Sequence, residues 1–434
     1  MRKYLLLMLL PINFVVLGCS SEDEDKGLDL VTSGRVLIAN SGVDATGQIG
    51  LDLQVLDIDE TEAMDFTDSQ ASPISQRSAM KTASELKLTK IGSISPPISN
   101  GVTLQASDIL VLSSLAFVAY NVQGEQFLGA VQIIDISNRM APEIIAEMIL
   151  LDADVHGLTK HGAELYLAIG VDPDKNEDFS TPAGIEKIVL SNGSRRFKGS
   201  AGRVDLPSFA ATDVILTHSY LVVTSGDVGG GASLINRSSF AFHQFLPSYD
   251  ARGVSRYKGG KVALISGQPG RIDILNTQTL SFEQNFPVAG ASTPESKSTI
   301  QMVGSVAFVG AGEGGVQVVD VETGQLRISI PQRHVPGLSL QDTVSNAITV
   351  DRHYGFVACG QAGISVVYFN KSQLTKTDFD SSIELSSPES LNARLVGQIA
   401  FGVNDSVNMV DIRHNYAFAA TGLGGVNIVL IEEN

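Results

Sequence analysis

From about residue 28 onward, apolar segments alternate with glycine-rich turns in a pattern that repeats along the chain. In each unit an apolar segment ends in a small residue and glycine, and a second glycine opens the next apolar segment. Residues 306–321 show this clearly, with VAFVGAG followed after two residues by GVQVVDV. Apolar and β-branched residues in short alternating runs bounded by glycine are typical of strands and tight turns. Each unit therefore predicts two antiparallel strands joined by a turn.

This strand pair recurs eight times. Its first strand is predicted at Arg35–Gly42, Leu115–Asn121, Leu165–Gly170, Tyr220–Gly226, Lys261–Gly267, Val306–Gly312, Tyr354–Gly360 and Tyr416–Gly422. Its second strand is predicted at Gly50–Asp59, Gly129–Ser137, Gly184–Asn192, Gly231–Arg237, Gly270–Asn276, Gly315–Glu322, Gly363–Asn370 and Gly425–Glu432. Most units add an outer strand, as at Glu143–Leu150, Leu326–Pro331 and Arg394–Phe401, and an inner strand precedes the pair.

Four antiparallel strands repeated about every 40–50 residues predict an all-β fold, a β-propeller built of four-stranded antiparallel blades. No segment of the chain has a competing helical period. A single blade would leave two apolar faces in water, and stacking blades around an axis buries both faces of each. We therefore expect residues 28–434 to form a single propeller domain.

The number of blades depends on the two ends of the repeat array. Eight copies favour eight blades. The last copy, however, ends at Asn434 before an outer strand, and the first has only a short inner strand at Leu28–Thr32. If Leu86–Ser95 supplies the outer strand of the last blade, the first copy is degenerate and the propeller has seven blades. Eight is the preferred count and seven the alternative.

The second strands carry a recognisable motif. GVQVVDV at 315–321, AVQIIDIS at 130–137 and GLDLQVLDID at 50–59 resemble the LVIVD-repeat family of β-propellers, as does the tyrosine-led strand YAFAA at 416–420. The resemblance extends over about residues 28–434, although the third to fifth copies lack the aspartate of the motif. It implies a propeller fold. It implies no particular activity, because the family shares a scaffold and no catalytic motif.

The first eighteen residues have the features of an export signal. Arg2 and Lys3 precede the apolar run Tyr4–Leu17, which is shorter than the ~20 residues that span a bilayer. The run ends in VLGC, which resembles the lipobox of bacterial lipoproteins. We therefore expect cleavage after residue 18, lipidation of Cys19 and attachment to a membrane of the cell envelope.

Residues 19–27 contain the acidic run SSEDED at 20–25 and are predicted to form a tether. The run also resembles a signal that carries some lipoproteins to the cell surface, so a plain tether and a surface signal both remain open. Serine after the lipidated cysteine favours the outer membrane, with the domain facing the periplasm or the exterior. The other cysteine, Cys359, lies in an apolar run and is predicted to be buried.

The charge of the chain excludes one class of partner. The formal net charge is −17, and removal of Arg2 and Lys3 with the signal lowers it to −19. A domain with this excess of carboxylates repels nucleic acid and anionic membrane surfaces. We therefore expect no nucleic-acid binding.

Long loops between the paired strands are the first candidate for a functional surface. These loops are minimal in the later copies and lengthen at Val43–Ile49, Val122–Leu128 and Val171–Ala183. Binding residues concentrate on such loops. The last loop places side-chain oxygens at alternate positions, the spacing of a Ca²⁺ loop, although the glycine and the bidentate glutamate of an EF-hand are missing. The candidate metal ligands are Asp172, Asp174, Asn176 and Asp178, and a solvated acidic turn is the alternative interpretation.

Polar residues at the start of the inner strands are the second candidate. They would line the mouth of a central channel and hold a cation or a small ligand, or they would only satisfy backbone donors. These residues are Asp108, Asp154, His156, Asp213, Asn346 and Asn408.

Motifs for known chemistry are missing from the sequence: it has no C-x-x-C-H, H-E-x-x-H or G-x-S-x-G segment. We therefore expect a non-catalytic scaffold that binds a protein or another extracellular macromolecule. The alternative is a hydrolase or lyase that acts on an extracellular polymer through acidic residues near the channel, which would require converging carboxylates with raised pKa values.

Overall fold

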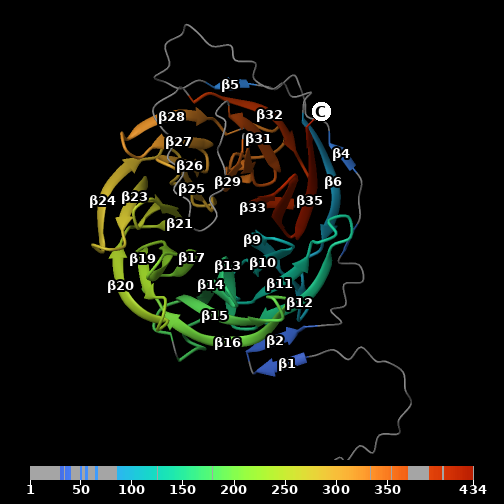
Figure 1. Ribbon diagram of the computed structural model, residues 1–434, viewed down its shortest axis with the longest axis vertical. Helices are drawn as coiled ribbons and strands as arrows, with labels where there is room; N and C mark the ends of the chain where they lie inside the picture. The colour runs from blue at the N-terminus through green and yellow to red at the C-terminus, as the bar shows by residue number, and fades with distance from the viewer. Residues whose placement is uncertain are drawn as a thin grey trace, which may run out of the picture.

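The computed structural model describes residues 30–33, 35–40, 49–50, 54–56, 64–66, 86–124, 126–177, 179–332, 334–352, 354–369, 391–402 and 405–433. In these described residues the protein is all-β, with antiparallel sheets arranged around a common centre as in Figure 1. The predicted all-β class and the four-stranded antiparallel units are confirmed.

Four sheets consist of four consecutive strands each, and the innermost strand comes first in the chain. The first sheet contains β13 (Ala153–His161), β14 (Glu164–Val171), β15 (Ala183–Ser191) and β16 (Arg196–Asp205). The second contains β17 (Ala210–Leu216), β18 (Tyr220–Gly226), β19 (Gly231–Asn236) and β20 (Ala241–Pro247). The third contains β21 (Ala251–Tyr257), β22 (Lys261–Gly267), β23 (Gly270–Asn276) and β24 (Ser281–Pro287). The fourth contains β25 (Ile300–Val303), β26 (Val306–Gly310), β27 (Val316–Asp320) and β28 (Gln325–Ile330).

The remaining strands form larger sheets around similar four-stranded groups. One group is β29 (Ala347–Asp351), β30 (Tyr354–Ala358), β31 (Ile364–Phe369) and β32 (Ala393–Ile399). A second is β9 (Gln105–Leu112), β10 (Leu115–Asn121), β11 (Gly129–Asp135) and β12 (Glu143–Leu150). A third is β33 (Asp405–Arg413), β34 (Tyr416–Gly422) and β35 (Val426–Glu433) with β6 (Leu86–Ile94) from the other end of the chain. A single residue pair, Gly422 with Ala106, joins the last two groups.

Strand β6 takes the outer position beside β35, the arrangement on which the seven-blade alternative depends. A turn glycine packs closely against β6, as turn glycines do against the outer strands of two other groups. Gly315 and Gly363 have positive φ, and a Cβ there would lie 2.0 Å from Ile330 O and 1.8 Å from Ile399 O. At Gly425 the same close approach is made to a carbonyl of β6, that of residue 94, at 2.1 Å. Only glycine fits where a left-handed turn residue packs against the outer strand.

The strands of the first predicted repeat do not pair with one another among the described residues. Strand β2 (Val36–Ala39) pairs with the outer strand β12 and with β1 (Leu30–Ser33). Strands β3 (Ile49–Gly50) and β4 (Gln54–Leu56) instead pair with β6. The first repeat was expected to form a separate unit. Its strands instead pair with open edges of other four-stranded groups, where backbone N–H and C=O groups are available for pairing.

The N-terminal segment therefore adds strands to the outer edges of three four-stranded groups. Besides β1 to β4, the short β5 (Met64–Phe66) pairs with β32. Asn40 fixes the segment to a further sheet, because its side chain exchanges two hydrogen bonds with the backbone of Phe197, at 2.8 and 2.7 Å. Arg35 Nη1 lies 3.0 Å from Glu186 Oε1 in the same sheet.

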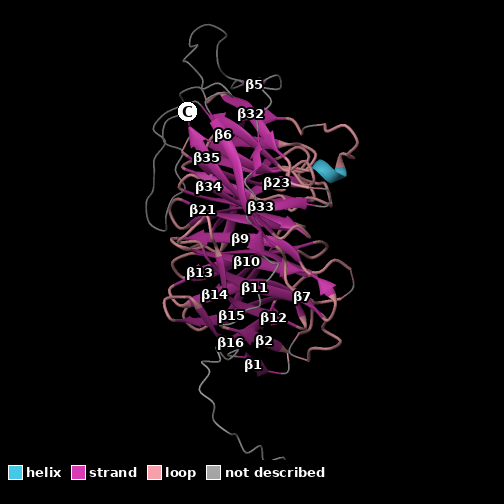
Figure 2. Ribbon diagram, turned by 90° about the vertical axis from the view of Figure 1, so that its right-hand side faces the viewer, coloured by secondary structure: helices cyan, strands magenta, loops and turns pink. Residues whose placement is uncertain are grey.

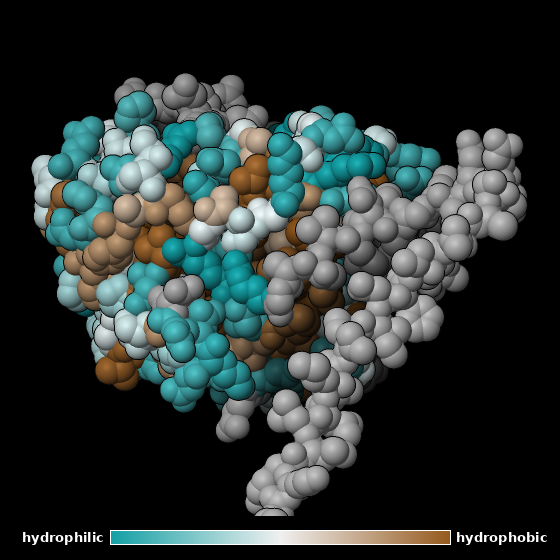
Figure 3. Space-filling model, turned by 90° about the horizontal axis from the view of Figure 1, so that it is seen from below, coloured by the Kyte–Doolittle hydropathy of each residue, from teal (hydrophilic) through white to brown (hydrophobic). Residues whose placement is uncertain are grey.

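Burial changes from the centre outward and explains the apolar runs of the sequence. Strand β10 is buried along almost its whole length, because sheets cover both of its faces, and such strands read as continuous apolar segments. Outer strands such as β20 and β24 are largely exposed. Figure 3 views the molecule from the side of the outer strands and shows apolar residues in patches among polar ones.

The two faces of the molecule carry different connections. The loops between the second and third strands and the connections between sheets lie on one face, here called the loop face. Strands β7 (Ile98–Ser99) and β8 (Val102–Thr103) and the 3-10 turn η3 (Gln341–Thr343) lie in connections between sheets, and Figure 2 shows β7 and the turn on the same side. Within the described part of the chain, no helix is long and apolar enough to cross a membrane.

Candidate functional site at the centre of the sheets

A β-bulge in several inner strands sets the geometry of the centre. The pairing of each strand with its neighbour shifts by one residue, so one residue remains outside the ladder and its side chain is redirected. In four consecutive groups the bulged residue is polar. These residues are Ser107, His156, Thr212 and Arg252.

The bulged side chains link neighbouring inner strands. Ser107 Oγ donates to the carbonyl of Val155 at 2.6 Å, and Thr212 Oγ1 donates to the carbonyl of Ala251 at 3.0 Å. Each acceptor directly precedes the bulged residue of the next strand. Asn346 and Asn408 continue the pattern in other groups, since their amides donate to Val407 O at 3.0 Å and Ala106 O at 2.9 Å. The amide groups of both asparagines therefore satisfy backbone acceptors of a neighbouring inner strand.

Two of the predicted aspartates accept backbone N–H groups from the next inner strand. Asp108 Oδ2 accepts the N–H of Leu158 at 2.9 Å, and Asp213 Oδ2 accepts the N–H of Val254 at 3.0 Å. Both donors belong to the next inner strand, two residues after its bulge. These carboxylates therefore hold adjacent sheets in register.

Asp154 holds one of the long loops. Its Oδ1 accepts the backbone N–H groups of Val122 at 3.0 Å and Leu128 at 3.3 Å, at the two ends of the loop 122–128. Beside it, His156 Nδ1 lies 3.2 Å from Asn121 Nδ2, so this nitrogen accepts from the amide. The predicted loop and the predicted channel residues thus meet at one place.

Lys297 joins the predicted residues across the centre, and the sequence interpretation did not include it. It lies in the connection between β24 and β25, on the opposite side of the centre from β9 and β13 (Figure 1). Its Nζ donates to the carbonyls of Ser107 at 3.0 Å and His156 at 3.2 Å, and lies 3.4 Å from Asp108 Oδ1. Its backbone N–H donates to Asn346 Oδ1 at 3.1 Å. One ammonium group therefore connects sheets on opposite sides of the centre.

Burial shifts the pKa values of three of the predicted channel residues. Burial, with repulsion from Asp108, raises the pKa of Asp213 to about 6, and Lys297 opposes this rise. Burial raises the pKa of Asp154 to about 7. Burial and then Lys297 lower the pKa of His156 to about 4, so its ring is neutral at physiological pH.

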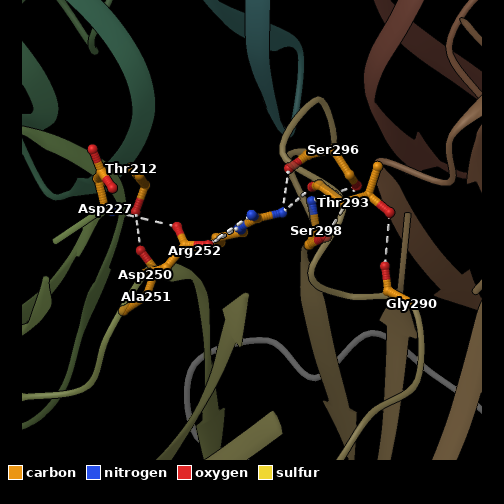
Figure 4. Close-up of polar contacts among 9 residues, drawn as sticks. All are labelled: Thr212, Asp227, Asp250, Ala251, Arg252, Gly290, Thr293, Ser296 and Ser298. Atoms are coloured by element: carbon orange, nitrogen blue, oxygen red, sulfur yellow. Dashed lines mark hydrogen bonds and ion pairs between the residues drawn. The ribbon is translucent and has the colours of Figure 1, made fainter. Parts of the chain in front are cut away.

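Figure 4 shows how Arg252 positions the connection that carries Lys297. The guanidinium is buried and donates through Nε at 3.0 Å and Nη2 at 2.6 Å to Asp250 Oδ2. Its Nη1 donates to the carbonyls of Thr293 at 2.5 Å and Ser296 at 3.0 Å. Arg252 is thus a positioning residue, and the unusual length of this connection was the sequence signal that could have revealed it.

The predicted calcium loop uses its side chains in other contacts. Asp172 Oδ2 lies 2.8 Å from Lys175 Nζ, and Asp172 Oδ1 accepts the N–H of Asp174 at 3.1 Å. Asn176 Nδ2 donates to Asp152 Oδ2 at 3.1 Å. Asp178 lies outside the described residues. Among the residues that the structure describes, no group of three or more His, Cys, Asp or Glu side chains is placed to hold a metal ion.

An apolar patch on the loop face was missed by the sequence interpretation. Phe209, Val228 and Tyr249 are 61%, 68% and 38% exposed and lie in three short connections. Hydrogen bonds hold these connections together: Ser208 Oγ donates to Gly226 O at 2.5 Å, and Asp250 N donates to Asp227 O at 3.3 Å. The three connections are therefore neighbours, and their exposed side chains are here called the apolar patch. Large apolar residues in turns of glycine, serine and aspartate were the signal for them.

Of the remaining predicted residues, some lie within the described part of the chain and others lie outside it. Cys359 is buried at 6% exposure, as its apolar surroundings predicted. Cys19 lies outside the described residues, as do most of the loop 43–49 and the acidic tether. No protein-family model matches the chain, and no curated protein was found to be similar to it. The LVIVD resemblance therefore stays a prediction.

Proposed function

We propose that this chain is a closed, seven-bladed β-propeller of the LVIVD type, anchored by lipid on Cys19 in the cell envelope, that binds a protein or another extracellular macromolecule through its loop face. Seven clusters of buried apolar side chains support the closed form, because each contains residues from two neighbouring four-stranded groups. One of them combines Ile94 and Ile428 with Ala106 and Val118, the last group with the first.

The apolar patch is the observation that carries the binding function. Exposed apolar side chains that lie together on a folded surface mark interaction sites. Ile98, Leu340 and Leu423 are also exposed and lie on the loop face, at 67%, 48% and 47%. A rigid scaffold that presents short apolar turns on one face is suited to a macromolecular partner.

The polar centre favours a scaffold over the hydrolase or lyase alternative. That alternative needs two carboxylates that converge on a substrate. Asp154 and Asp213 have raised pKa values, yet each accepts backbone N–H groups from a neighbouring segment. Their contacts are those of residues that hold strands and loops together.

Photo-crosslinking should distinguish the two faces. With benzoylphenylalanine at position 209 or 228 of the full chain, we expect ultraviolet-dependent adducts in cells that produce the protein naturally, because the partner would contact the apolar patch. The same group at Met140, which is 43% exposed on the opposite face, should give none. Adducts would be measured by immunoblotting and identified by mass spectrometry.

A charge in the apolar patch provides the matched test. Val228→Asp should lower the adduct yield at position 209 several-fold, since a carboxylate would have to be desolvated against the partner. Equal adducts at position 140, or an unchanged yield at position 209 in the Val228→Asp variant, would contradict the proposed binding face.

The anchor has its own test. Cys19→Ser should abolish incorporation of a palmitate analogue and release the protein from the membrane fraction, because the thiol is the acceptor of the lipid. Cys359→Ser is the control and should label like the wild type, since that side chain is buried. Continued labelling of the Cys19→Ser chain would show that the anchor is elsewhere.

A further inference from the structure

One side of the apolar patch adjoins the long loop 171–183. The backbone N–H of Ala183 donates to Ser208 O at 3.3 Å, and Ser208 directly precedes Phe209 of the patch. The loop contains Glu177, which is exposed. An exposed carboxylate therefore occurs in the segment that borders the patch on this side.

The other side of the apolar patch adjoins the connection between β24 and β25. Arg252, which follows Tyr249 closely in the chain, donates through Nη1 to Thr293 O at 2.5 Å. Thr293 Oγ1 in turn accepts the backbone N–H of Glu313 at 3.1 Å. Glu313 is exposed, as is Glu295, which lies in the same connection as Thr293. The segments on both sides of the patch therefore carry exposed carboxylates.

Basic side chains do not neutralise these carboxylates. A further exposed acid, Asp227, directly precedes Val228 within the patch. Among the described residues, no Lys, Arg or His nitrogen lies within ion-pair distance of the four carboxylates, which belong to Glu177, Asp227, Glu295 and Glu313.

The basic side chains of the same segments are paired with other groups. Lys175 Nζ lies 2.8 Å from Asp172 Oδ2, and Arg252 Nη2 lies 2.6 Å from Asp250 Oδ2. Lys297 Nζ donates to backbone carbonyls at the centre of the sheets. The surface around the apolar patch therefore has an excess of negative charge.

A protein segment that carries both apolar and basic side chains matches this surface. Its apolar side chains would remove Phe209, Val228 and Tyr249 from water, which favours association. Its Lys or Arg side chains would lie around that contact, where opposite charges across an interface speed association and select the partner. An anionic polymer would be repelled by the carboxylates, and a neutral glycan would gain nothing from their charge.

We propose that the partner of the apolar patch is a protein segment in which Lys or Arg side chains flank apolar ones. The patch would contact the apolar side chains, and the exposed carboxylates at positions 177, 227, 295 and 313 would attract the basic ones. This inference rests on the proposed function, which it narrows from a macromolecule to a protein of defined charge.

Peptide binding to the full chain in non-ionic detergent, measured by fluorescence anisotropy, tests the chemistry of the partner. The probe is a short labelled peptide in which lysine alternates with leucine and phenylalanine, and detergent alone is the blank. We expect saturable binding that about 0.5 M NaCl weakens severalfold, because salt screens exposed charges. The same peptide with serine in place of lysine should bind about tenfold more weakly, and with glutamate it should not bind.

Variants with one changed side chain locate the binding surface. Asp227→Asn should weaken binding of the lysine peptide about two- to fivefold, and its combination with Glu177→Gln about tenfold, because each change removes one exposed charge. Phe209→Ser should also weaken binding, through lost apolar contact. Glu143→Gln removes an exposed carboxylate from the opposite face and should leave the affinity unchanged. Glu313→Gln replaces any carboxylate variant that does not melt like the wild type.

Three results would overturn the proposal: no peptide binds, the serine or glutamate peptide binds as tightly as the lysine peptide, or the carboxylate variants bind it as tightly as Glu143→Gln. Photo-crosslinking at position 209 in cells separates such a failure from failure of the proposed function. Adducts whose yield is unchanged in the Asp227→Asn variant would retain the binding face and reject only the basic partner.

Discussion

Replacing Gly363 with alanine should lower the free energy of unfolding by about 3–5 kcal/mol, one of the largest effects expected of a single methyl group in this protein. Gly363 has φ +87°, a left-handed conformation that alanine adopts only with strain. A Cβ there would also lie 1.8 Å from Ile399 O in the outer strand β32, so the two strands would have to separate. Urea unfolding followed by circular dichroism measures the change.

Gly337→Ala is the matched control for this prediction. Gly337 has φ +90°, but nothing lies within 4 Å of a Cβ at that position. Alanine there should cost only about 1–2 kcal/mol, the price of the backbone conformation alone. The difference between the variants measures the close approach of the turn to the outer strand. Equal effects would show that this approach does not limit the choice of residue.

Replacing Arg252 with methionine should destabilise the protein by about 3–5 kcal/mol, because it leaves a buried carboxylate without its cation. Asp250 is only 8% exposed and receives two of the hydrogen bonds of Arg252. The carbonyls of Thr293 and Ser296 would also lose their donor, which loosens the connection that carries Lys297. The same urea unfolding measurement applies.

Two further variants separate the buried charge from the loss of packing. Lys175→Met breaks the exposed ion pair with Asp172, where the lysine side chain is 79% exposed, and should cost less than about 1 kcal/mol. Asp250→Asn combined with Arg252→Met should recover part of the lost stability, since no buried charge remains. A double variant no more stable than Arg252→Met would show that the arginine acts only through the carbonyls of the connection.

Local sequence patterns determined the strands and turns of this protein. The predicted strands Leu115–Asn121, Tyr220–Gly226, Lys261–Gly267 and Tyr416–Gly422 coincide with β10, β18, β22 and β34. This was possible because the chain itself contains what fixes such a strand: a buried apolar run and the glycine that follows it. Of the bulged polar residues, only His156 was among the residues predicted from the sequence.

The partners of the first predicted repeat were decided only by the tertiary structure. Residues 36–39 and 49–50 were expected to pair within one unit, but they lie on the edges of two different four-stranded groups. An isolated strand pair carries no signal for the edge it joins, because that choice depends on which distant edges remain open. The closure of the last group by Leu86–Ile94 was for this reason only an alternative at the level of sequence.

In the candidate sites, too, some residues were predicted from the sequence and others were revealed only by the structure. The sequence located Asp108, His156 and Asp213 near the starts of inner strands. Asp108 and Asp213 occupy equivalent places directly after the bulged residue, and His156 is the bulged residue of the strand between them. The sequence did not reveal Lys297, whose ammonium group reaches residues 141 and 190 positions away in the chain. The apolar patch likewise combines side chains from connections of several sheets. Contacts between residues so distant in sequence have no local period, so only the packing of the sheets around their centre brought them together.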